Sequence, residues 1–309
     1  MVVKHVLESQ QFDRDILFSL FEKADELRKN SSMNLNGKIL ATLFYEPSTR
    51  TRLSFESAMI KLGGKVISTE NAKEFSSAIK GESIEDSIRV ISTYSDCIVM
   101  RHNKEGAAFI ASKVSKVPII NAGDGKGQHP TQAILDVYTI YKEIKRLDKL
   151  KIAMVGDLST GRTVRSLCYL LGKFNEIEIV FVSPENLKIR EDIKEYLKKH
   201  EIKFTEKENL DEVLPGVNVI YMTRIQKERM SVEDYEKANA KYVINKDNFD
   251  LINKNSIIMH PLPHVEEIDL SVDVEQNDKR IAYFRQAENG LYIRMALLDL
   301  ILNNENKTI

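Results

Sequence analysis

The polar segment 46–52, with the sequence Glu-Pro-Ser-Thr-Arg-Thr-Arg, constrains the fold of this chain more than any other stretch. An apolar run, 39–45, precedes it, and residues 53–62 follow with apolar side chains at helical spacing. Gly63 and Gly64 then supply the left-handed residue that commonly ends a helix. The predicted order is therefore strand, tight turn and helix, with the polar segment on the first turn of the helix.

This turn has the composition of an anion-binding site. The first N–H groups of a helix are unpaired and carry a partial positive charge, and Ser48, Thr49 and Thr51 add three hydroxyl groups there. Arg50 and Arg52 add two guanidinium groups, which oppose the helix dipole unless an anion compensates. The alternative is that Ser48 or Thr49 only caps the helix while both arginines lie in solvent. The crowding of two arginines favours a phosphate site.

Length and composition describe a globular protein with two cores. The 309 residues fit about two domains of roughly 150 residues each, and 42% hydrophobic with 29% charged residues is ordinary for a soluble protein. A net charge of −1 offers no overall attraction for nucleic acid or an anionic membrane. Cys97 and Cys168 stand alone in apolar segments, so we expect buried free thiols, no metal site and a cytoplasmic location. We expect neither a secretory signal nor a membrane span.

Short apolar runs alternate with helix-period segments along the chain, which is typical of doubly wound parallel sheets. The predicted strands are 39–45, 65–68, 97–100, 117–121, 151–155, 177–182, 217–222 and 256–259. The predicted helices include 14–29, 53–62, 84–94, 107–115, 130–145, 162–172 and 290–303. We therefore predict an α/β protein with two doubly wound domains, each a mainly parallel sheet flanked by helices. The domains are residues 1–147 and 148–287, and a C-terminal helix, 288–309, returns to the first.

Unusual polar residues follow the carboxyl ends of these predicted strands. They are Arg50, Arg101, His129, Arg162, Arg224 and His260. In an open α/β sheet this edge forms the ligand crevice. A single arginine is more often a surface ion-pair partner, but four that converge from two domains imply substrates with several negative charges.

Residues 156–163 support a rival hypothesis, a nucleoside triphosphate site. Their spacing matches the phosphate loop GxxxxGK[ST], except that Arg162 replaces the lysine. The lysine position suits a compact ammonium rather than a planar fork, and no later strand ends in the aspartate expected for magnesium. Arg162 suits a bidentate contact with a carboxylate instead. A nicotinamide site is weaker still, because GxGxxG is absent.

Taken in order, the motifs of the chain resemble those of the transcarbamoylase family. The matching segments are 44–52 (FYEPSTRTR), 80–82 (KGE), 100–102 (MRH), 121–125 (NAGDG), 129–132 (HPTQ), 161–163 (GRT), 221–229 (YMTRIQKER), 260–263 (HPLP) and 289–290 (NG). Pro261 stands where ornithine-specific members typically carry cysteine, and 223–229 is similar to the aspartate-specific members. His264 departs from the arginine of many relatives, so a charge contact there is not carried over.

The resemblance implies transfer of the carbamoyl group of carbamoyl phosphate to the amine of L-aspartate. The products would be N-carbamoyl-L-aspartate and phosphate, in pyrimidine biosynthesis, with no cofactor and no metal. Four residues are implied to hold the phosphate group: Ser48, Thr49, Arg50 and Thr51. Thr51, Arg101 and His129 would donate to the carbonyl oxygen and stabilise the oxyanion. For His129 the alternative is a hydrogen bond that closes the loop before Pro130.

The remaining implied roles concern the carbamoyl amide and aspartate. Gln132 and the backbone carbonyls of Leu262 and Pro263 would orient the amide. The side chains implied to bind the two carboxylates of aspartate are Arg162, Arg224 and Gln226. The departing phosphate can accept the proton of the amine, so no side chain is assigned as general base.

The resemblance also implies an assembly. The active sites of a homotrimer would be shared between subunits, with Ser76 and Lys80 reaching the neighbouring site, although Lys80 alone would pass for a solvated loop lysine. Any regulatory chain would be a separate polypeptide, because this sequence has no zinc-binding cysteine set. Two other hypotheses stay open, an inactive homologue that keeps the fold and a transferase for another amine.

Overall fold

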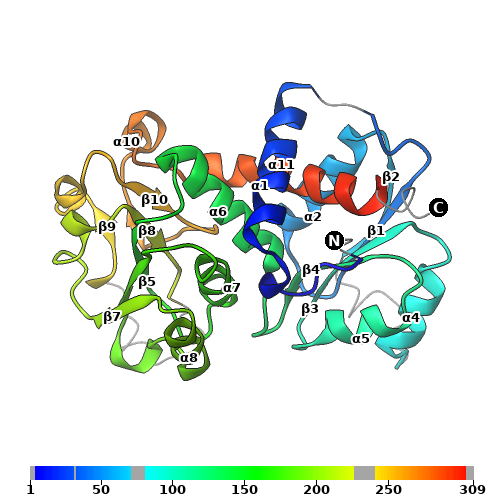
Figure 1. Cartoon of the computed structure of the whole chain (residues 1–309), viewed down its shortest axis with the longest axis horizontal. Coiled ribbons are helices and arrows are strands. Elements are labelled where there is room, and N and C mark those ends of the chain that lie inside the picture. The colour runs from blue at the N-terminus through cyan, green and yellow to red at the C-terminus, as the bar shows by residue number, and fades with distance from the viewer. Residues whose placement is uncertain (1–3, 31–32, 71–80, 226–240, 304–309) are drawn as a thin grey trace. The chain divides into compact units, whose positions relative to one another are not determined.

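The structure is a computed structural model that describes residues 4–30, 33–70, 81–225 and 241–303 (Figure 1). The chain divides into two compact units, Met1–Leu135 with Glu288–Ile309 and Asp136–Ala287. Each unit contains its own parallel sheet, flanked by helices. The predicted fold class, two α/β units built on parallel sheets, is confirmed.

The sheet of the first unit has four parallel strands in the order β2-β1-β3-β4. These strands are β1 (Ile39–Phe44), β2 (Lys65–Glu70), β3 (Cys97–His102) and β4 (Ile119–Asp124). The helices that begin in this part of the chain are η1 (Ser9–Gln11), α1 (Arg14–Lys29), α2 (Thr49–Lys61), α4 (Ile84–Ile91), α5 (Ala107–Val114) and α6 (Pro130–Ile144). Five of the six residues of β1 are buried, as expected for an inner strand covered on both faces.

The sheet of the second unit has five parallel strands in the order β10-β8-β5-β6-β7. These strands are β5 (Lys151–Val155), β6 (Glu178–Val182), β7 (Lys203–Lys207), β8 (Val219–Met222) and β10 (Ile257–Met259). A separate parallel pair joins β9 (Ile244–Asn245) and β11 (Ile268–Asp269). The helices are α7 (Arg162–Leu171), α8 (Glu191–Lys199), α10 (Val272–Asn277), α11 (Tyr283–Asn303), and the short η3 (Glu185–Leu187), η4 (Leu214–Gly216) and η6 (Phe249–Leu251).

Strand β7 lies outside the sequence prediction. Its sequence, Lys-Phe-Thr-Glu-Lys, has a single apolar residue, and four of its five positions are exposed. Among the strands that the structure describes, β7 pairs with β6 alone and forms the edge of the sheet. An edge strand that faces water gives no apolar run, so hydrophobic patterning could not detect it.

The C-terminal helix returns to the first unit, as predicted. From Glu288 onward α11 belongs to that unit. Arg28 of α1 donates to Glu288 at 2.9 Å and to Asn289 at 2.6 Å. The buried Arg294 places its guanidinium carbon 5.1 Å from the centre of the Phe55 ring on α2. The end of the chain is therefore held by both α1 and α2.

Two further expectations can be compared with the structure. Cys97 and Cys168 are both buried free thiols, as the sequence indicated, and burial raises the pKa of Cys168. Among the residues that the structure describes, no helix combines the length and apolar character needed to cross a bilayer.

Gly156, directly after β5, occupies a position that only glycine tolerates. Its φ is +110°, and an added Cβ would lie 2.2 Å from the backbone oxygen of Thr223. We expect Gly156→Ala to lower the free energy of unfolding by about 1–3 kcal/mol, measured by urea denaturation. The matched control is Gly216→Ala, where an added Cβ meets nothing within 4 Å and the change should be neutral or slightly stabilising. Equal denaturation midpoints for both variants would contradict this account.

Candidate active site

The ends of β1 and β3 bring two parts of the predicted phosphate site together. Phe44 is paired with Arg101 in the ladder, and the N–H of Tyr45 donates to the carbonyl oxygen of Arg101 at 2.9 Å. The chain then turns through Glu46, whose Oε2 lies 3.1 Å from Nε of Arg101. Glu46 had no predicted role. It balances the charge of Arg101, so an anion that binds Arg101 has to compete with this carboxylate.

The side chain of Ser48 does not cap the first turn of α2. Ser48 occupies the N-cap position with extended backbone, but its side chain makes no capping hydrogen bond. Thr49 is exposed, and Thr51 is buried on the first turn. Within the described ranges of the chain, no carboxylate forms an ion pair with Arg50, whose pKa is lowered by partial burial. Hydroxyl, N–H and guanidinium groups are thus available for an anion.

Arg52 does not contribute to this anion site. Its Nη2 lies 3.0 Å from Glu70 of β2, and its Nη1 lies 3.8 Å from Glu56, one helical turn later. Two carboxylates therefore balance a charge that the sequence had assigned to the phosphate turn. Sequence spacing predicts the i,i+4 partner Glu56, but Glu70 becomes a neighbour only because β1 and β2 are parallel.

The predicted residues His129 and Gln132 lie at the start of α6, after the end of β4. Both are buried, and the His129 carbonyl accepts from the N–H of Gln132 at 3.0 Å. The loop before them is closed by Asp124, whose carboxylate accepts from the N–H groups of Gln128 at 2.8 Å and Gly106 at 2.9 Å. Nδ1 of His129 is 3.4 Å from the hydroxyl of Thr131, at the limit of a hydrogen bond. Loop closure therefore rests on Asp124.

In the second unit, the turn between β5 and α7 positions Arg162. The buried carboxylate of Asp157 accepts from the Ser159 hydroxyl at 3.0 Å, and from Thr160 at 3.1 Å through its N–H and 2.5 Å through its hydroxyl. These hydrogen bonds engage N–H and hydroxyl groups that would bind a phosphate in a nucleotide-binding loop. They therefore weaken the hypothesis of a nucleoside triphosphate site at residues 156–163. Arg162 follows as the first residue of α7 and is half-buried.

Arg224 emerges beside this turn. The preceding residue, Thr223, donates to the carbonyl oxygen of Val155 through its N–H at 2.9 Å and its hydroxyl at 2.7 Å. The ends of β5 and β8 are thus joined, and Arg224 is exposed immediately after them. Neither Asp157 nor Thr223 had been assigned a role. The signal that could have indicated the closed turn after β5 is Asp157, which stands three residues before Thr160 and can accept hydrogen bonds from it.

The third set of site residues follows β10. The peptide between Leu262 and Pro263 is cis; Leu262 is half-buried and Pro263 exposed. His260 follows a strand end like the arginines, but its side chain is only 2% exposed and its Nε2 lies 2.8 Å from the buried carboxylate of Glu267. His264, which replaces the arginine of many relatives, lies 3.3 Å from Glu275 of α10. The side chain of His260 therefore lies in the protein interior beside Glu267.

Each sheet thus gathers one set of predicted residues at three neighbouring strand ends (Figure 1). In the first unit, the segments that follow β1 and β4 and the end of β3 contain Ser48, Thr49, Arg50, Thr51, Arg101, His129 and Gln132. In the second unit, the segments that follow β5, β8 and β10 contain Arg162, Arg224, Leu262 and Pro263. Ser76, Lys80 and Gln226 lie outside the described residues.

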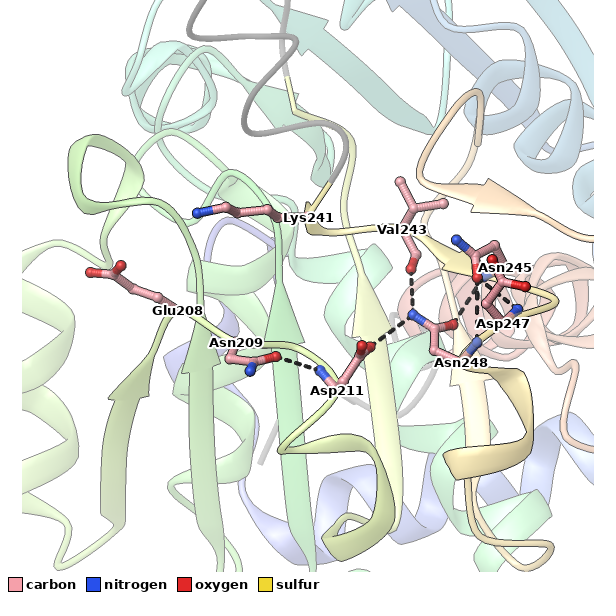
Figure 2. Close-up of a pocket in the computed structure, with 8 residues that line it drawn as sticks. All are labelled: Glu208, Asn209, Asp211, Lys241, Val243, Asn245, Asp247 and Asn248. Atoms are coloured by element: carbon pink, nitrogen blue, oxygen red, sulfur yellow. Dashed lines mark hydrogen bonds between the residues drawn. The ribbon is translucent and has the colours of Figure 1, made fainter.

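The second unit also contains a polar pocket near the carboxyl ends of β7 and β9 (Figure 2). Its lining residues are Glu208, Asn209, Asp211, Lys241, Val243, Asn245, Asp247 and Asn248. The side-chain amide of Asn248 donates to Asp211 and to the Val243 carbonyl, both at 2.9 Å. None of the predicted site residues that the structure describes lines this pocket, and its hydrogen bonds join the segment around β9 to the loop after β7.

Two family models match the chain. One is the aspartate/ornithine carbamoyltransferase carbamoyl-P binding domain, over residues 4–142, and the other is the Asp/Orn binding domain of the same family, over residues 148–301. The chain belongs to the aspartate/ornithine carbamoyltransferase family. This assignment agrees with the transcarbamoylase motifs of the sequence.

Relatives within the aspartate/ornithine carbamoyltransferase family cover nearly the whole chain. The chloroplastic aspartate carbamoyltransferase 1 of Pisum sativum is 55% identical, over 96% of this chain and 78% of that protein. The aspartate carbamoyltransferase catalytic subunit of Methanocaldococcus jannaschii is 50% identical, over 99% of this chain and all of that protein. A crystal structure of the M. jannaschii catalytic subunit superposes with a TM-score of 0.90 at 49% identity, covering 99% of this chain and 100% of that one.

The buried carboxylate of Glu267 makes stability depend on pH. Burial raises its pKa, but the close contact with Nε2 of His260, together with the N–H groups of Glu267 and Val265, outweighs burial and lowers the pKa below its ordinary value. A carboxylate whose pKa is lowered by folding stabilises the folded protein at pH values above its unfolded pKa of about 4.3. This stabilisation is lost as the pH falls below that value.

We therefore expect Glu267→Gln to lower the free energy of unfolding by about 1–3 kcal/mol at pH 7. The difference from wild type should shrink as the pH falls from about 5 to about 3, and urea denaturation at each pH measures it. Glu195→Gln, at an exposed position of α8, is the control and should stay within about 0.5 kcal/mol at every pH. A difference that grows toward low pH would contradict the assigned cause.

Proposed function

We propose that the chain is the catalytic chain of an aspartate carbamoyltransferase. It transfers the carbamoyl group of carbamoyl phosphate to the amine of L-aspartate, giving N-carbamoyl-L-aspartate and phosphate, in de novo pyrimidine biosynthesis. The observation that carries the proposal is the match with enzymes of this name at 50–55% identity over nearly the whole chain. The two sets of residues at the strand ends supply the chemistry.

In this proposal, the strand ends of the first unit bind carbamoyl phosphate. Ser48, Thr49 and Arg50 hold the phosphate group on the first turn of α2, supported by the uncapped hydroxyl and the guanidinium without an ion pair among the described residues. Thr51, Arg101 and His129 donate to the carbonyl oxygen, while Gln132 orients the amide. A structure of the Trypanosoma cruzi enzyme with bound carbamoyl phosphate, TM-score 0.89 at 38% identity over 97% of each chain, supports the substrate.

The strand ends of the second unit bind aspartate and the carbamoyl amide. Arg162 and Arg224, with Gln226, bind the two carboxylates, and bidentate guanidinium–carboxylate pairs fix the orientation of the amine. The carbonyls of Leu262 and Pro263 accept from the carbamoyl NH₂ group. The first unit thus supplies the contacts to the phosphate and carbonyl groups, and the second supplies those to aspartate and to the carbamoyl amide. We propose residues 1–147 and 288–309 as the carbamoyl-phosphate domain and 148–287 as the aspartate domain.

The chemical step needs only positioning and charge. The amine nitrogen attacks the carbamoyl carbon, the carbonyl oxygen becomes an oxyanion, and the bond to the phosphate oxygen breaks. Donors aimed at the oxyanion typically contribute about 10²- to 10³-fold each in rate. The amine proton leaves with the phosphate, which accounts for a site rich in arginine and poor in bases.

We also propose a cytoplasmic homotrimer with shared active sites, in which Ser76 and Lys80 act across the interface. Support comes from β2, which is an edge strand of its sheet and pairs, among the described strands, with β1 alone. Three large apolar side chains on β2 and α2 are exposed: Leu53, Ile60 and Ile67. An open edge beside exposed apolar side chains favours burial against another copy. Separate regulatory chains belong to the same proposal.

The choice of amine can be tested directly. Purified protein should release phosphate from carbamoyl phosphate when L-aspartate is added, but not with ornithine. The reason is that Arg162 and Arg224 favour a second carboxylate and repel the ammonium group of ornithine. Phosphate release in a coupled assay is the measurement. Equal turnover with both amines would overturn the specificity, and no turnover with either would favour an inactive homologue.

Sharing of sites predicts complementation between inactive variants. Arg50→Ala and Lys80→Ala trimers should each lose activity, and subunit exchange should restore part of it. An intact site needs Arg50 from one subunit and Lys80 from its neighbour, so random exchange leaves one half times one half, about a quarter, of the sites intact. Activity is followed while mass spectrometry verifies exchange. No recovery after complete exchange would show that Lys80 does not act across the interface.

A further inference from the structure

The ring of His260 is held in one tautomer by its neighbours. Nδ1 accepts a hydrogen bond from the backbone N–H of Leu262 at 2.8 Å, so Nδ1 carries no proton. The ring proton therefore lies on Nε2, which faces Oε1 of Glu267 at 2.8 Å. Both side chains are almost completely buried. A buried carboxylate beside Nε2 stabilises this tautomer, as in other pairs where a carboxylate orients an imidazole.

The backbone of His260 is held by a second buried chain of hydrogen bonds. Its N–H donates to Oε1 of Gln286 at 2.9 Å, and Nε2 of Gln286 donates to Oδ1 of Asp136 at 2.6 Å. The other oxygen of Asp136 accepts from the hydroxyl of Tyr221 at 2.7 Å. Gln286, Asp136 and Tyr221 are all at most 1% exposed. Since Tyr221 belongs to β8, this chain ties the turn after β10 to the strand that leads to Arg224.

The hydrogen bond from the Leu262 N–H to His260 restrains a residue with an uncommon backbone conformation. Leu262 has φ of +57°, in the left-handed region that a leucine rarely adopts. Such a conformation persists where the surroundings fix it from several sides. Nδ1 of His260 fixes the N–H of Leu262, and because the peptide group is planar it fixes the whole group that joins Pro261 to Leu262. The orientation of this peptide group sets the direction in which the backbone continues into Pro263.

We propose that His260 is a positioning residue for the carbamoyl group. Its Nδ1 holds the backbone of residues 261–263 so that the carbonyls of Leu262 and Pro263 meet the substrate amide, and Glu267 keeps the ring in the tautomer that this requires. The inference rests on the proposed function of these carbonyls. His260 itself touches no substrate, so its effect on the reaction passes entirely through the backbone.

Two substitutions separate positioning from simple pairing with Glu267. In His260→Asn, Oδ1 replaces Nδ1 as an acceptor two residues before the Leu262 N–H, but the side chain is too short to reach Glu267. In His260→Gln, the amide nitrogen reaches the position of Nε2, but the acceptor for Leu262 is lost. Both are made together with Glu267→Gln, so that neither variant contains an unpaired buried carboxylate.

If His260 positions the backbone, H260N/E267Q should be more active than H260Q/E267Q. We expect kcat/KM for carbamoyl phosphate to be about 10- to 100-fold higher in H260N/E267Q than in H260Q/E267Q, since a displaced backbone costs alignment of the amide. If His260 served only to pair with residue 267, the order of the two variants would be reversed, because the glutamine at position 260 reaches residue 267 and the asparagine does not. Equal values, or the reverse order, overturn the proposal. The matched control is His200→Asn, a histidine stacked on Tyr196 with ring centres 3.9 Å apart, which should stay within about twofold of wild type.

A measurement without substrate tests the same inference. In the full chain labelled with ¹⁵N-histidine, Nδ1 of His260 should resonate at pH 8 as an unprotonated nitrogen and Nε2 as a protonated one. A protonated Nδ1 overturns the proposal even when the enzyme is active. If the wild-type protein transfers no carbamoyl group to aspartate, the proposed function fails, and the nitrogen spectrum still decides whether His260 holds the backbone of Leu262.

Discussion

The parallel pairing of neighbouring strands is the constraint on which the rest of this molecule depends. It brings the carboxyl ends of β1, β3 and β4 to one edge of the first sheet, and those of β5, β8 and β10 to one edge of the second. Two hydrogen bonds show how directly this works. Tyr45 binds the backbone of Arg101 at 2.9 Å, and Thr223 binds that of Val155 at 2.9 Å. Residues more than fifty positions apart become neighbours without any contact between their side chains.

Buried carboxylates then fix the turns that leave these strands. Asp124 closes the loop after β4, Asp157 closes the turn after β5, and Glu267 holds the ring of His260 after β10. Each is at most 4% exposed, and a buried carboxylate is tolerated only where donors surround it. Because these three acids point inward, they leave the neighbouring arginines to meet anions from outside. Glu46 is different, since it pairs with Arg101 itself.

Hydrophobic patterning could predict the inner strands of both sheets and the helices between them, because strands such as β1 and β5 are buried on both faces. It missed β7, whose exposed edge position removes that signal. The sequence also could not distinguish Arg50 from Arg52. They lie on the same helical turn, yet Arg52 is neutralised by Glu70, a residue that only the pairing of β1 with β2 brings near.

The position of a residue at a strand end is therefore necessary for a role in binding but does not decide it. Arg50 and His260 both follow a strand and both belong to family motifs. Arg50 is exposed and forms no ion pair within the described chain, whereas both ring nitrogens of His260 face protein atoms at 2.8 Å. Nδ1 of His260 is already engaged by the N–H of Leu262, so the effect of this nitrogen on the reaction has to pass through the backbone that it holds. In the function proposed for this site, arginines meet the substrates, and a histidine with two acids holds the backbone behind them.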